Sequence, residues 1–305
     1  MAMLPVNVTK DIESNLPQRS LQFISGQSLS LLQPKVMGIL NITPDSFSTV
    51  GRYLSPREAL KYAKQMVADG AAIIDIGAEA TNPQLTPNLT LDEELHRLLP
   101  VLELLQGEIP LPISVDTSKP EVMYEAVQLG ASMINDVRAL TRPGALAMAA
   151  QLQTVVCLMH MGYPDGKPES LNDLTKDNEI DIVTTIKAFL SERITACLNA
   201  GIRREHIIID PGIGHGNFGK NLKQNLRLLA HLADLQTFDL PILVGLSRKT
   251  FIGEVLDVSS EERVFGSIAS AVMAVERGAS LIRVHDVKAT VQAIQLLTAI
   301  MSEAN

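Results

Sequence analysis

The sequence predicts an α/β fold in which eight parallel strands and the helices that follow them form a (β/α)8 TIM barrel. Short apolar runs, often β-branched and not alternating with polar residues, recur along the chain, as is typical of parallel strands buried on both faces. Amphipathic, helix-like segments separate these runs. Nearly every run ends on a polar residue, which indicates a barrel with its site on the C-terminal face.

The predicted strands and helices alternate along the chain. The strands are expected at residues 36–42, 72–76, 113–116, 133–136, 154–160, 207–210, 241–246 and 281–285. The helices with the clearest apolar stripe are expected at residues 55–69, 91–105, 119–129, 182–199, 222–235 and 261–276. We predict that Ser118 caps the helix opened by a Lys-Pro pair, that Gly130 terminates this same helix, and that Gly70 terminates the helix at residues 55–69.

A single barrel domain is expected over residues 35–305, because no linker or low-complexity segment divides the chain. Residues 1–34 are expected to form an N-terminal tail that leads into a short hairpin at residues 21–32. The alternative architecture is an open doubly wound sheet, which would gather its functional residues after two or three strands at a topological switch point. The polar residues that end the predicted strands are instead spread over all of them: Asn41, Asp75, Asp116, Asn135, His160, Asp210, Ser247 and His285.

Composition and charge exclude several classes of function. The 26 Lys and Arg against 34 Asp and Glu give a net charge of −8, so we expect no nucleic-acid partner and no membrane partner. Cys157 and Cys197 are too few for a disulfide framework or a zinc finger. The sequence does not open with a basic segment followed by an apolar run, and no uninterrupted apolar stretch is long enough to cross a bilayer. These features predict a soluble, cytoplasmic protein.

The first predicted strand and its loop contain a candidate substrate contact. The string MGILNITPDSFS places an amide, Asn41, at the end of the strand and an aromatic residue, Phe47, in the loop. A loop aromatic can close over a flat substrate, as catalytic lids do. The second loop, in the string DIGAEATNP, is interpreted from its small residues as a structural turn.

Two carboxylates are predicted to point into the mouth of the barrel. Asp116 in SVDTSKP shares a strand face with Ser114, and a carboxylate there is costly unless it is paired or binds a ligand. Asp210 ends the strand before the loop PGIGHGNFGK, which lacks the Gly-Lys-Ser/Thr ending of a P-loop. We therefore interpret Asp210 as the informative residue, and His215 and Asn217 as exposed loop residues.

The last two predicted strands carry a candidate anion site. The string GLSRKTFIG places Gly245, Ser247 and Lys249 on one face, and RVHDV places Arg283 and His285 on one face. The ends of strands seven and eight are a frequent location for phosphate in barrels. Because the protein as a whole is acidic, cationic side chains gathered at this point favour an anion-binding site over ordinary surface charge.

A tightly held transition metal is not expected. The chain has no His-x-His and no His-Glu-x-x-His, only scattered single histidines. His160 has the opposite strand parity to Met159 and Met161, which favours a structural role. A Mg²⁺ that arrives with a phosphate ligand needs only one or two protein oxygens, and Asn41 could supply one.

Seven strings together resemble the dihydropteroate synthase family: MGILNITPDSFS, SVDTSKP, IND, LMHM, DPG, GLSRK and RVHDV, in this order from about residue 35 to residue 287. Members of that family are (β/α)8 transferases of folate biosynthesis and targets of sulfonamides. They join 6-hydroxymethyl-7,8-dihydropterin pyrophosphate to p-aminobenzoate and release pyrophosphate. The resemblance implies these two small-molecule substrates, Mg²⁺ as cofactor and a homodimer.

The resemblance also implies which residues hold each part of the substrates. The pterin would contact Asp116, Asn135, Val137, Met159, Asp210, Gly245 and Lys249, of which Asp116, Asp210 and Lys249 would be catalytic. The pyrophosphate would contact Asn41, Arg283 and His285, with Asn41 as the metal ligand. The p-aminobenzoate would contact Phe47, Thr81, Pro83, Ser247 and Thr250.

In the mechanism implied for the family, pyrophosphate departs in an SN1-like step and leaves a cationic methylene-pterin. Asp210 would accept hydrogen bonds from the N–H edge of the pterin, and Asp116 would stabilise the cation. Mg²⁺, Arg283 and His285 would stabilise the leaving anion at the other end of the breaking bond. The aromatic amine would then attack, while closed loops exclude water.

The sequence departs from the family pattern in three loops. Residues 48–51 read Ser-Thr-Val-Gly where the family usually has Ser-Asp-Gly-Gly, and residues 79–84 read Glu-Ala-Thr-Asn-Pro-Gln in place of Glu-Ser-Thr-Arg-Pro-Gly. The loop after Asp210 is also longer than usual. Because of these departures, a catalytically altered or non-catalytic pterin-binding relative of the family is an alternative interpretation of the chain. A folate-binding methyltransferase barrel is a further alternative, but it would have no evident use for GLSRK and RVHDV at an anion site.

Overall fold

The computed structural model describes residues 20–42, 55–79, 89–162, 181–215 and 218–303. The candidate substrate contacts Phe47, Thr81 and Pro83 lie outside the described residues, as does Asn217. The architecture and most of the candidate site can be followed in the described part.

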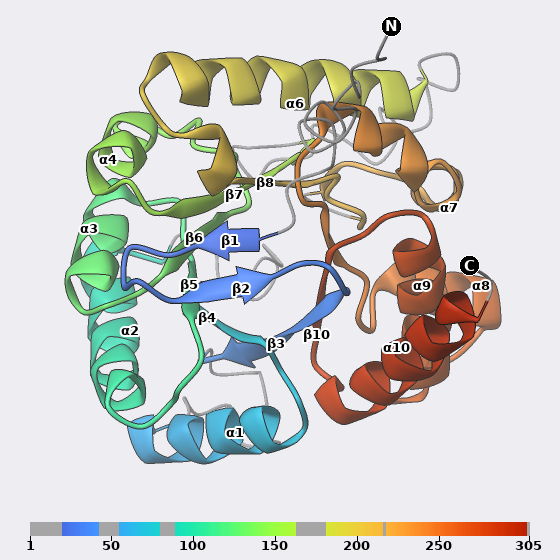
Figure 1. Ribbon diagram of the computed structural model, residues 1–305, viewed down its shortest axis with the longest axis horizontal. Coiled ribbons are helices and arrows are strands. Elements are labelled where there is room, and N and C mark those ends of the chain that lie inside the picture. The colour runs from blue at the N-terminus through green and yellow to red at the C-terminus, as the bar shows by residue number, and fades with distance from the viewer. Residues whose placement is uncertain (1–19, 43–54, 80–88, 163–180, 216–217, 304–305) are drawn as a thin grey trace, which may run out of the picture.

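Eight parallel strands form the centre of the molecule (Figure 1), which confirms the predicted (β/α)8 barrel. The strands pair in the order β8-β7-β6-β5-β4-β3-β10-β9. Backbone pairing between Ile209 and Ile242 joins the two ends of this series and closes the barrel. The bounds are β3 (Lys35–Asn41), β4 (Ile73–Gly77), β5 (Ile113–Asp116), β6 (Met133–Asp136), β7 (Val155–Met159), β8 (Ile207–Asp210), β9 (Leu243–Gly245) and β10 (Leu281–Val284).

Helices surround the barrel and alternate with its strands (Figure 1). Two predicted helices are divided, because 3-10 turns at Leu232–Phe238 and Glu261–Arg263 replace the end of one and the start of the other. The α-helices are α1 (Pro56–Ala68), α2 (Leu91–Gln106), α3 (Pro120–Gln128), α4 (Ala145–Leu152), α6 (Ile182–Asn199), α7 (Leu222–Ala230), α8 (Thr250–Leu256), α9 (Val264–Glu276) and α10 (Val287–Ser302). No helix in the described part is long and apolar enough to cross a membrane.

The helix ends test the predicted capping residues. Gly70 and Gly130 follow α1 and α3 with φ of +95° and +98°, left-handed conformations that glycine adopts at little cost, as predicted. The prediction that Ser118 caps α3 is wrong. Lys119 occupies the N-cap position without a side-chain cap, and the Ser118 hydroxyl donates instead to the buried Asp136 carboxylate. A buried acceptor has thus taken the hydroxyl that sequence reasoning assigned to the helix end.

The predicted hairpin is present and covers one end of the barrel. Its strands β1 (Ser20–Gln22) and β2 (Ser28–Ser30) pair antiparallel and lie across the end that faces the viewer in Figure 1. Leu21 and Phe23 are buried and belong to the same apolar cluster as barrel residues such as Met37. The hairpin therefore seals the N-terminal end, which leaves the C-terminal end for substrates.

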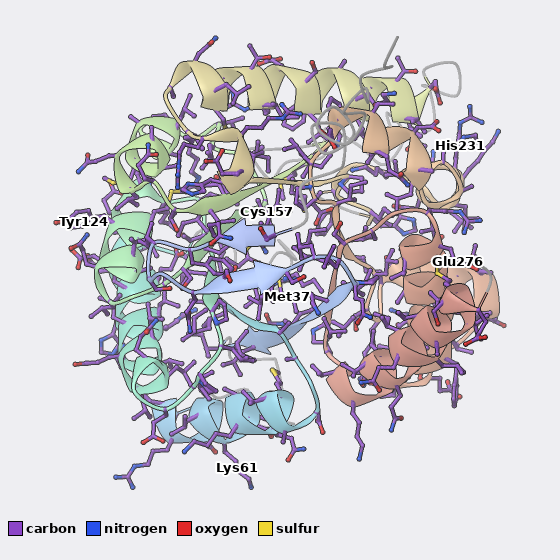
Figure 2. All side chains as sticks on the ribbon, in the orientation of Figure 1. Met37, Lys61, Tyr124, Cys157, His231 and Glu276 are labelled. Carbon is purple, nitrogen blue, oxygen red and sulfur yellow. The ribbon has the colours of Figure 1, made fainter. Side chains whose placement is uncertain are left out.

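The period of two along each strand separates an inner core from an outer core. Met37 and Cys157 lie near the middle of the molecule in Figure 2, whereas Lys61 and Tyr124 project from its rim. The inner residues form one buried cluster, and the outward strand residues pack with the helices in a larger one. Because alternate residues point the same way, the polar residue two positions beyond an inner apolar residue also points inward.

Candidate active site

Four polar side chains from four strands meet inside the C-terminal end of the barrel. Arg283 on β10 donates from Nε to Asp75 Oδ2 on β4 at 2.5 Å and from Nη2 to Asp116 Oδ2 on β5 at 2.9 Å. Asn135 on β6 donates from Nδ2 to Asp75 Oδ2 at 3.2 Å. Asp75, Asp116 and Asn135 are buried, and only 19% of the Arg283 side chain is exposed. The structure thus brings together three of the predicted site residues.

Asp75 is a site residue that the sequence analysis missed. It is completely buried and accepts from both Arg283 and Asn135. The available signal was its position at the end of a predicted strand, in the same pattern as Asp116. The small residues of the loop that follows concealed this signal, because they favoured a structural turn.

The acidic side chains that contact Arg283 outnumber its single positive charge. Burial raises the pKa of Asp116 to about 8; Arg283 opposes this rise, and the neighbouring Asp75 adds to it. For Arg283, burial disfavours the charge, but Asp75 and Asp116 outweigh it and raise its pKa above the ordinary value. One guanidinium therefore faces two carboxylates, and the site has capacity to stabilise further positive charge.

The residue expected at the anion end of the site and the residue expected at the cation end are in direct contact. The resemblance places Arg283 at the leaving anion and Asp116 at the cation, and the structure pairs the Arg283 guanidinium with the Asp116 carboxylate. The physical reason is that inward side chains of a closed barrel converge on its axis, so a long arginine reaches strands that are not its neighbours.

Asp210 and Lys249 are a second set of oppositely charged residues that influence each other electrostatically. Burial raises the pKa of Asp210, while Lys249 and the Gly212 N–H, which donates to Asp210 Oδ1 at 2.7 Å, oppose the rise. Burial lowers the pKa of Lys249 to about 8, and Asp210 opposes that shift. The amine of Lys249 donates to the Ile213 carbonyl and lies 4.1 Å from the centre of the Phe218 ring.

An apolar wall lies beside these charged groups. Val137 and Met159, both predicted to line the pterin, form a small cluster with Met161, and the half-buried Phe218 packs against it. This cluster is distinct from the two large cores of the barrel. Apolar surface next to a few fixed polar groups is the usual composition of a site for a flat organic ring.

His285 and Ser247 lie together where β9 and β10 end. The backbone N–H of His285 donates to Ser247 Oγ at 3.2 Å, and its Nδ1 lies 3.1 Å from the same oxygen. Burial, together with the charges of Arg283 and Arg248, lowers the pKa of His285 to about 4. The imidazole is therefore neutral at pH 7 in the free protein.

The expected common face of Gly245, Ser247 and Lys249 is wrong. Strand β9 ends at Gly245, and Lys249 is the N-cap of α8. Between them Arg248 has φ of +57°, a left-handed conformation that interrupts the strand alternation. The Arg248 guanidinium donates through Nε and Nη2 to both carboxylate oxygens of Asp286, at 2.9 and 2.6 Å, and this fork holds the turn.

His215 is also placed differently from its expectation as an exposed loop residue. Its side chain is 19% exposed, and its Nδ1 lies 2.9 Å from Glu254 Oε1 and 3.2 Å from Thr250 Oγ1. Thr250, a predicted p-aminobenzoate contact, is exposed at the start of α8. The glycine-rich loop is therefore attached to α8, next to Lys249.

Asn41 ends β3 within the same mouth. Its Oδ1 would lie 3.7 Å from a Cβ atom added at Gly77, and Asp116 Cβ would lie 3.5 Å from that atom, so Gly77 leaves a space that both residues border. Among the described residues, no group of three or more His, Cys, Asp or Glu could hold a metal ion. A Mg²⁺ held mainly by phosphate and water needs only one or two protein oxygens, and the Asn41 amide fits that requirement.

Comparisons with known proteins agree with this geometry. The family model described as pterin binding enzyme matches residues 37–285. The dihydropteroate synthase of Escherichia coli (strain K12) is 47% identical over 280 residues, which cover 92% of this chain and 96% of that protein. A Coxiella burnetii dihydropteroate synthase solved with pteroic acid is 45% identical, with a TM-score of 0.81 over 92% of this chain and 98% of that chain. A Xanthomonas albilineans dihydropteroate synthase solved with 4-aminobenzoic acid is 44% identical, with a TM-score of 0.83 over 93% and 98%.

Proposed function

The chain belongs to the dihydropteroate synthase family of pterin-binding enzymes, and we propose on this basis how its residues carry out the family's reaction. The substrates are 6-hydroxymethyl-7,8-dihydropterin pyrophosphate and p-aminobenzoate, and the products are 7,8-dihydropteroate and pyrophosphate, in folate biosynthesis. The observation that carries the proposal is the cluster of Asp75, Asp116 and Arg283 beside Asp210 and Lys249 at the barrel mouth.

The pterin binds between the carboxylates and the apolar wall. Asp210 accepts from the N–H edge of the ring, while Asn135 and Lys249 supply further donors. Val137 and Met159 pack against the ring, and Gly245 leaves room beside it. Burial makes each carboxylate costly when alone, so a ligand that donates to it recovers that cost.

Asp116 stabilises the cation that forms when the bond to pyrophosphate breaks. Burial is the main cause of its raised pKa, Arg283 opposes the rise and Asp75 adds to it, so a cation beside Asp116 favours the ionised carboxylate. A positive charge that develops on the methylene-pterin is therefore favoured there, without any movement of solvent. Asp75 contributes indirectly, because it shares Arg283 with Asp116.

Pyrophosphate leaves toward Arg283 and His285. The exposed part of the Arg283 guanidinium faces the anion while Asp75 and Asp116 fix its orientation. His285 is neutral in the free protein, and an approaching anion favours its protonated form. Mg²⁺ bound to the pyrophosphate with Asn41 as a protein ligand would neutralise part of the charge on the leaving group.

The p-aminobenzoate enters above the pterin, next to Ser247 and Thr250. Both residues flank Lys249, and Lys249 lies beneath the ring of Phe218. Phe47, Thr81 and Pro83 remain predictions for this substrate. The relatives described above are dihydropteroate synthases, which favours a synthase over a methyltransferase barrel and over a non-catalytic relative.

A homodimer in the cytoplasm is the proposed state of the protein. Large apolar side chains are exposed on α9 and α10, namely Phe265 at 83%, Leu296 at 65% and Ile300 at 60%. Exposed apolar area of this kind on neighbouring helices commonly marks a protein interface. Sedimentation of the wild type and of Ile300→Glu tests the proposal: a dimer that the variant disrupts supports it, and a monomeric wild type contradicts it.

Release of pyrophosphate tests the enzymatic function directly. The purified protein is incubated with both substrates, with each alone, and with both in the absence of Mg²⁺. We expect release only when both substrates and Mg²⁺ are present. Release that does not depend on p-aminobenzoate, or no release under any condition, would contradict the proposed function.

A further inference from the structure

The loop between β8 and α7 contains a buried lysine that the reaction described above does not use. Lys220 is 1% exposed. Its Nζ donates to the Phe218 carbonyl at 2.9 Å and to the His160 carbonyl at 3.4 Å, and lies 3.1 Å from His160 Nδ1. In the part of the chain that the structure describes, its hydrogen-bond partners are all uncharged, and no carboxylate forms an ion pair with it.

The surroundings of Lys220 match its charged form. An ammonium group has three N–H donors and no acceptor, and the three atoms that face it are acceptors. Burial and the nearby Lys249 lower the pKa of Lys220 to about 7, and Asp210 opposes this shift. Burial also lowers the pKa of His160 to about 3, so the imidazole is neutral and its Nδ1 can accept. Burial of an amine costs free energy unless hydrogen bonds compensate for the lost water, and the three acceptors provide that compensation.

What Lys220 fixes is the backbone of two neighbouring loops. Its partners lie on the segment after β8, at Phe218, and on the segment after β7, at His160. The Gly162 N–H donates to the same Phe218 carbonyl at 3.1 Å, and a Cβ atom at Gly162 would lie only 2.7 Å from Gly219 Cα. The two segments are therefore in direct backbone contact, and Lys220 lies at their junction.

The junction determines where the ring of Phe218 lies. The ring packs against the cluster of Val137, Met159 and Met161, and its centre lies 4.1 Å from the Lys249 amine. A Cβ atom at Gly214 would approach the ring to 2.8 Å, so the loop leaves it little freedom. Phe218 is more exposed than the rest of the apolar wall, and it lies beside Lys249, which the predicted p-aminobenzoate contacts Ser247 and Thr250 flank in the chain.

We propose that Lys220 is a positioning residue for the p-aminobenzoate end of the site. It does not touch substrate, but it holds the Phe218 backbone against His160 and thereby fixes the Phe218 ring over Lys249. This inference rests on the proposed function, because the assay that tests it uses the same reaction. The ring of Phe189, which meets the His160 ring edge-on at 5.0 Å, supports the arrangement from behind.

Lys220→Met tests the inference, with Lys223→Met as the matched control on the exposed face of α7. Methionine keeps most of the length and removes the charge and its donors. In Lys220→Met we expect the KM for p-aminobenzoate to rise about tenfold and kcat to stay within about threefold, the size of effect given by one lost charged hydrogen bond. In Lys223→Met we expect both constants to be unchanged.

A double-mutant cycle with Phe218→Leu separates positioning from general structural damage. If Lys220 acts through Phe218, Lys220→Met has little further effect on the KM for p-aminobenzoate once the ring is gone. Additive effects, or equal KM values in Lys220→Met and Lys223→Met, would overturn the inference. Should Lys220→Met fail to fold, His160→Leu removes one acceptor of the same amine, and a rise in the same KM is expected; an unchanged KM would overturn the inference.

Calorimetric binding of 7,8-dihydropteroate distinguishes failure of the inference from failure of the proposed function. If the wild type releases no pyrophosphate, the proposed function fails, and binding alone decides the role of Lys220. An affinity about tenfold lower in Lys220→Met than in Lys223→Met supports positioning. Equal affinities would overturn the inference, and a wild type that does not bind the ligand would overturn both.

Discussion

Single residues at the barrel mouth combine burial with charge, and their surroundings determine what each can do. Asp210 is buried, accepts from the Gly212 N–H, and has its pKa raised by burial against the opposing effect of Lys249. A pterin edge that donates to this carboxylate supplies the hydrogen bonds that water would give to an exposed carboxylate. The same chemistry at the protein surface would contribute far less, because water competes for the acceptor.

Asp210→Ala is expected to nearly abolish pterin binding. Removing one partner of a buried, hydrogen-bonded charge pair costs about 2–5 kcal/mol, of which part is the unpaired donor left on the ligand. Calorimetry with a dihydropterin measures the loss, and Asp234→Ala, at an exposed position, is the control. A folded Asp210→Ala protein with affinity within about twofold of wild type would contradict the assignment of Asp210.

Asp116 should make the stability of the protein depend on pH. Its pKa is raised to about 8 by burial, so the folded state binds a proton more tightly than the unfolded state, where the pKa is about 3.8. The stability that this proton provides is fully present below about pH 4 and is lost as the pH rises toward 8. Asp116→Asn has no such proton to lose, so we expect its Tm to exceed that of wild type at pH 9 and to approach it at pH 5. Parallel Tm profiles across this range would contradict the prediction.

At the scale of elements, a buried ion pair joins α2 to the start of α3. Glu94 on α2 is fully buried and binds the Lys119 amine, and it accepts from Thr117 Oγ1 at 2.6 Å. Lys119 also lies 3.4 Å from Glu79, which follows β4. This network fixes the chain directly after Asp116 and just beyond the end of the neighbouring strand, so packing outside the barrel supports the site within it.

Glu94→Gln is expected to destabilise the fold by roughly 3 kcal/mol, because the amide keeps the shape but leaves the Lys119 charge poorly compensated. Urea unfolding measures the difference in the free energy of unfolding. Glu103→Gln, on the exposed face of the same helix, is the control and should behave like wild type. Equal midpoints for the two variants would show that the Glu94 carboxylate is dispensable.

Much of the element pattern could be read from the sequence, and the failures have local causes. The position at a strand end predicted Asp116, Asn135 and Asp210 at the barrel mouth, and the period of two predicted the face of Asp116 and of Arg283, because each lies within or at the end of a regular strand. The same reasoning failed beyond Gly245, since the strand had ended. Pairing across the barrel could not be read either, because it depends on the reach of side chains between strands distant in sequence.

In the whole molecule, the N-terminal end of the barrel contributes to stability and the C-terminal end carries the candidate site. The hairpin of β1 and β2 inserts Leu21 and Phe23 among inner barrel residues at the N-terminal end. The candidate site lies at the C-terminal end, where the strands carry Asp116 and Asp210. Stability and recognition are thus separated along the barrel axis, as is common in this architecture.

Leu21→Ala should therefore change stability and leave the substrate constants unchanged. Truncating a fully buried leucine typically costs about 2–5 kcal/mol, the larger values where the cavity cannot collapse. Chemical unfolding measures the loss, and the KM values for both substrates at a temperature where the variant is folded measure recognition. A changed KM with unchanged stability would show that the two ends are coupled.

The pairing of Arg283 has a consequence for synthesis of the chain on the ribosome. Its partners Asp116 and Asp75 precede it by 167 and 208 residues, so both carboxylates emerge long before their counter-ion. Until β10 is made, a nascent barrel would have to enclose two carboxyl groups without their counter-ion, which opposes its premature closure. Neutralisation of this pair thus coincides with arrival of the last strand, and a chain truncated before Arg283 would keep an open, acidic interior exposed to chaperones and proteases.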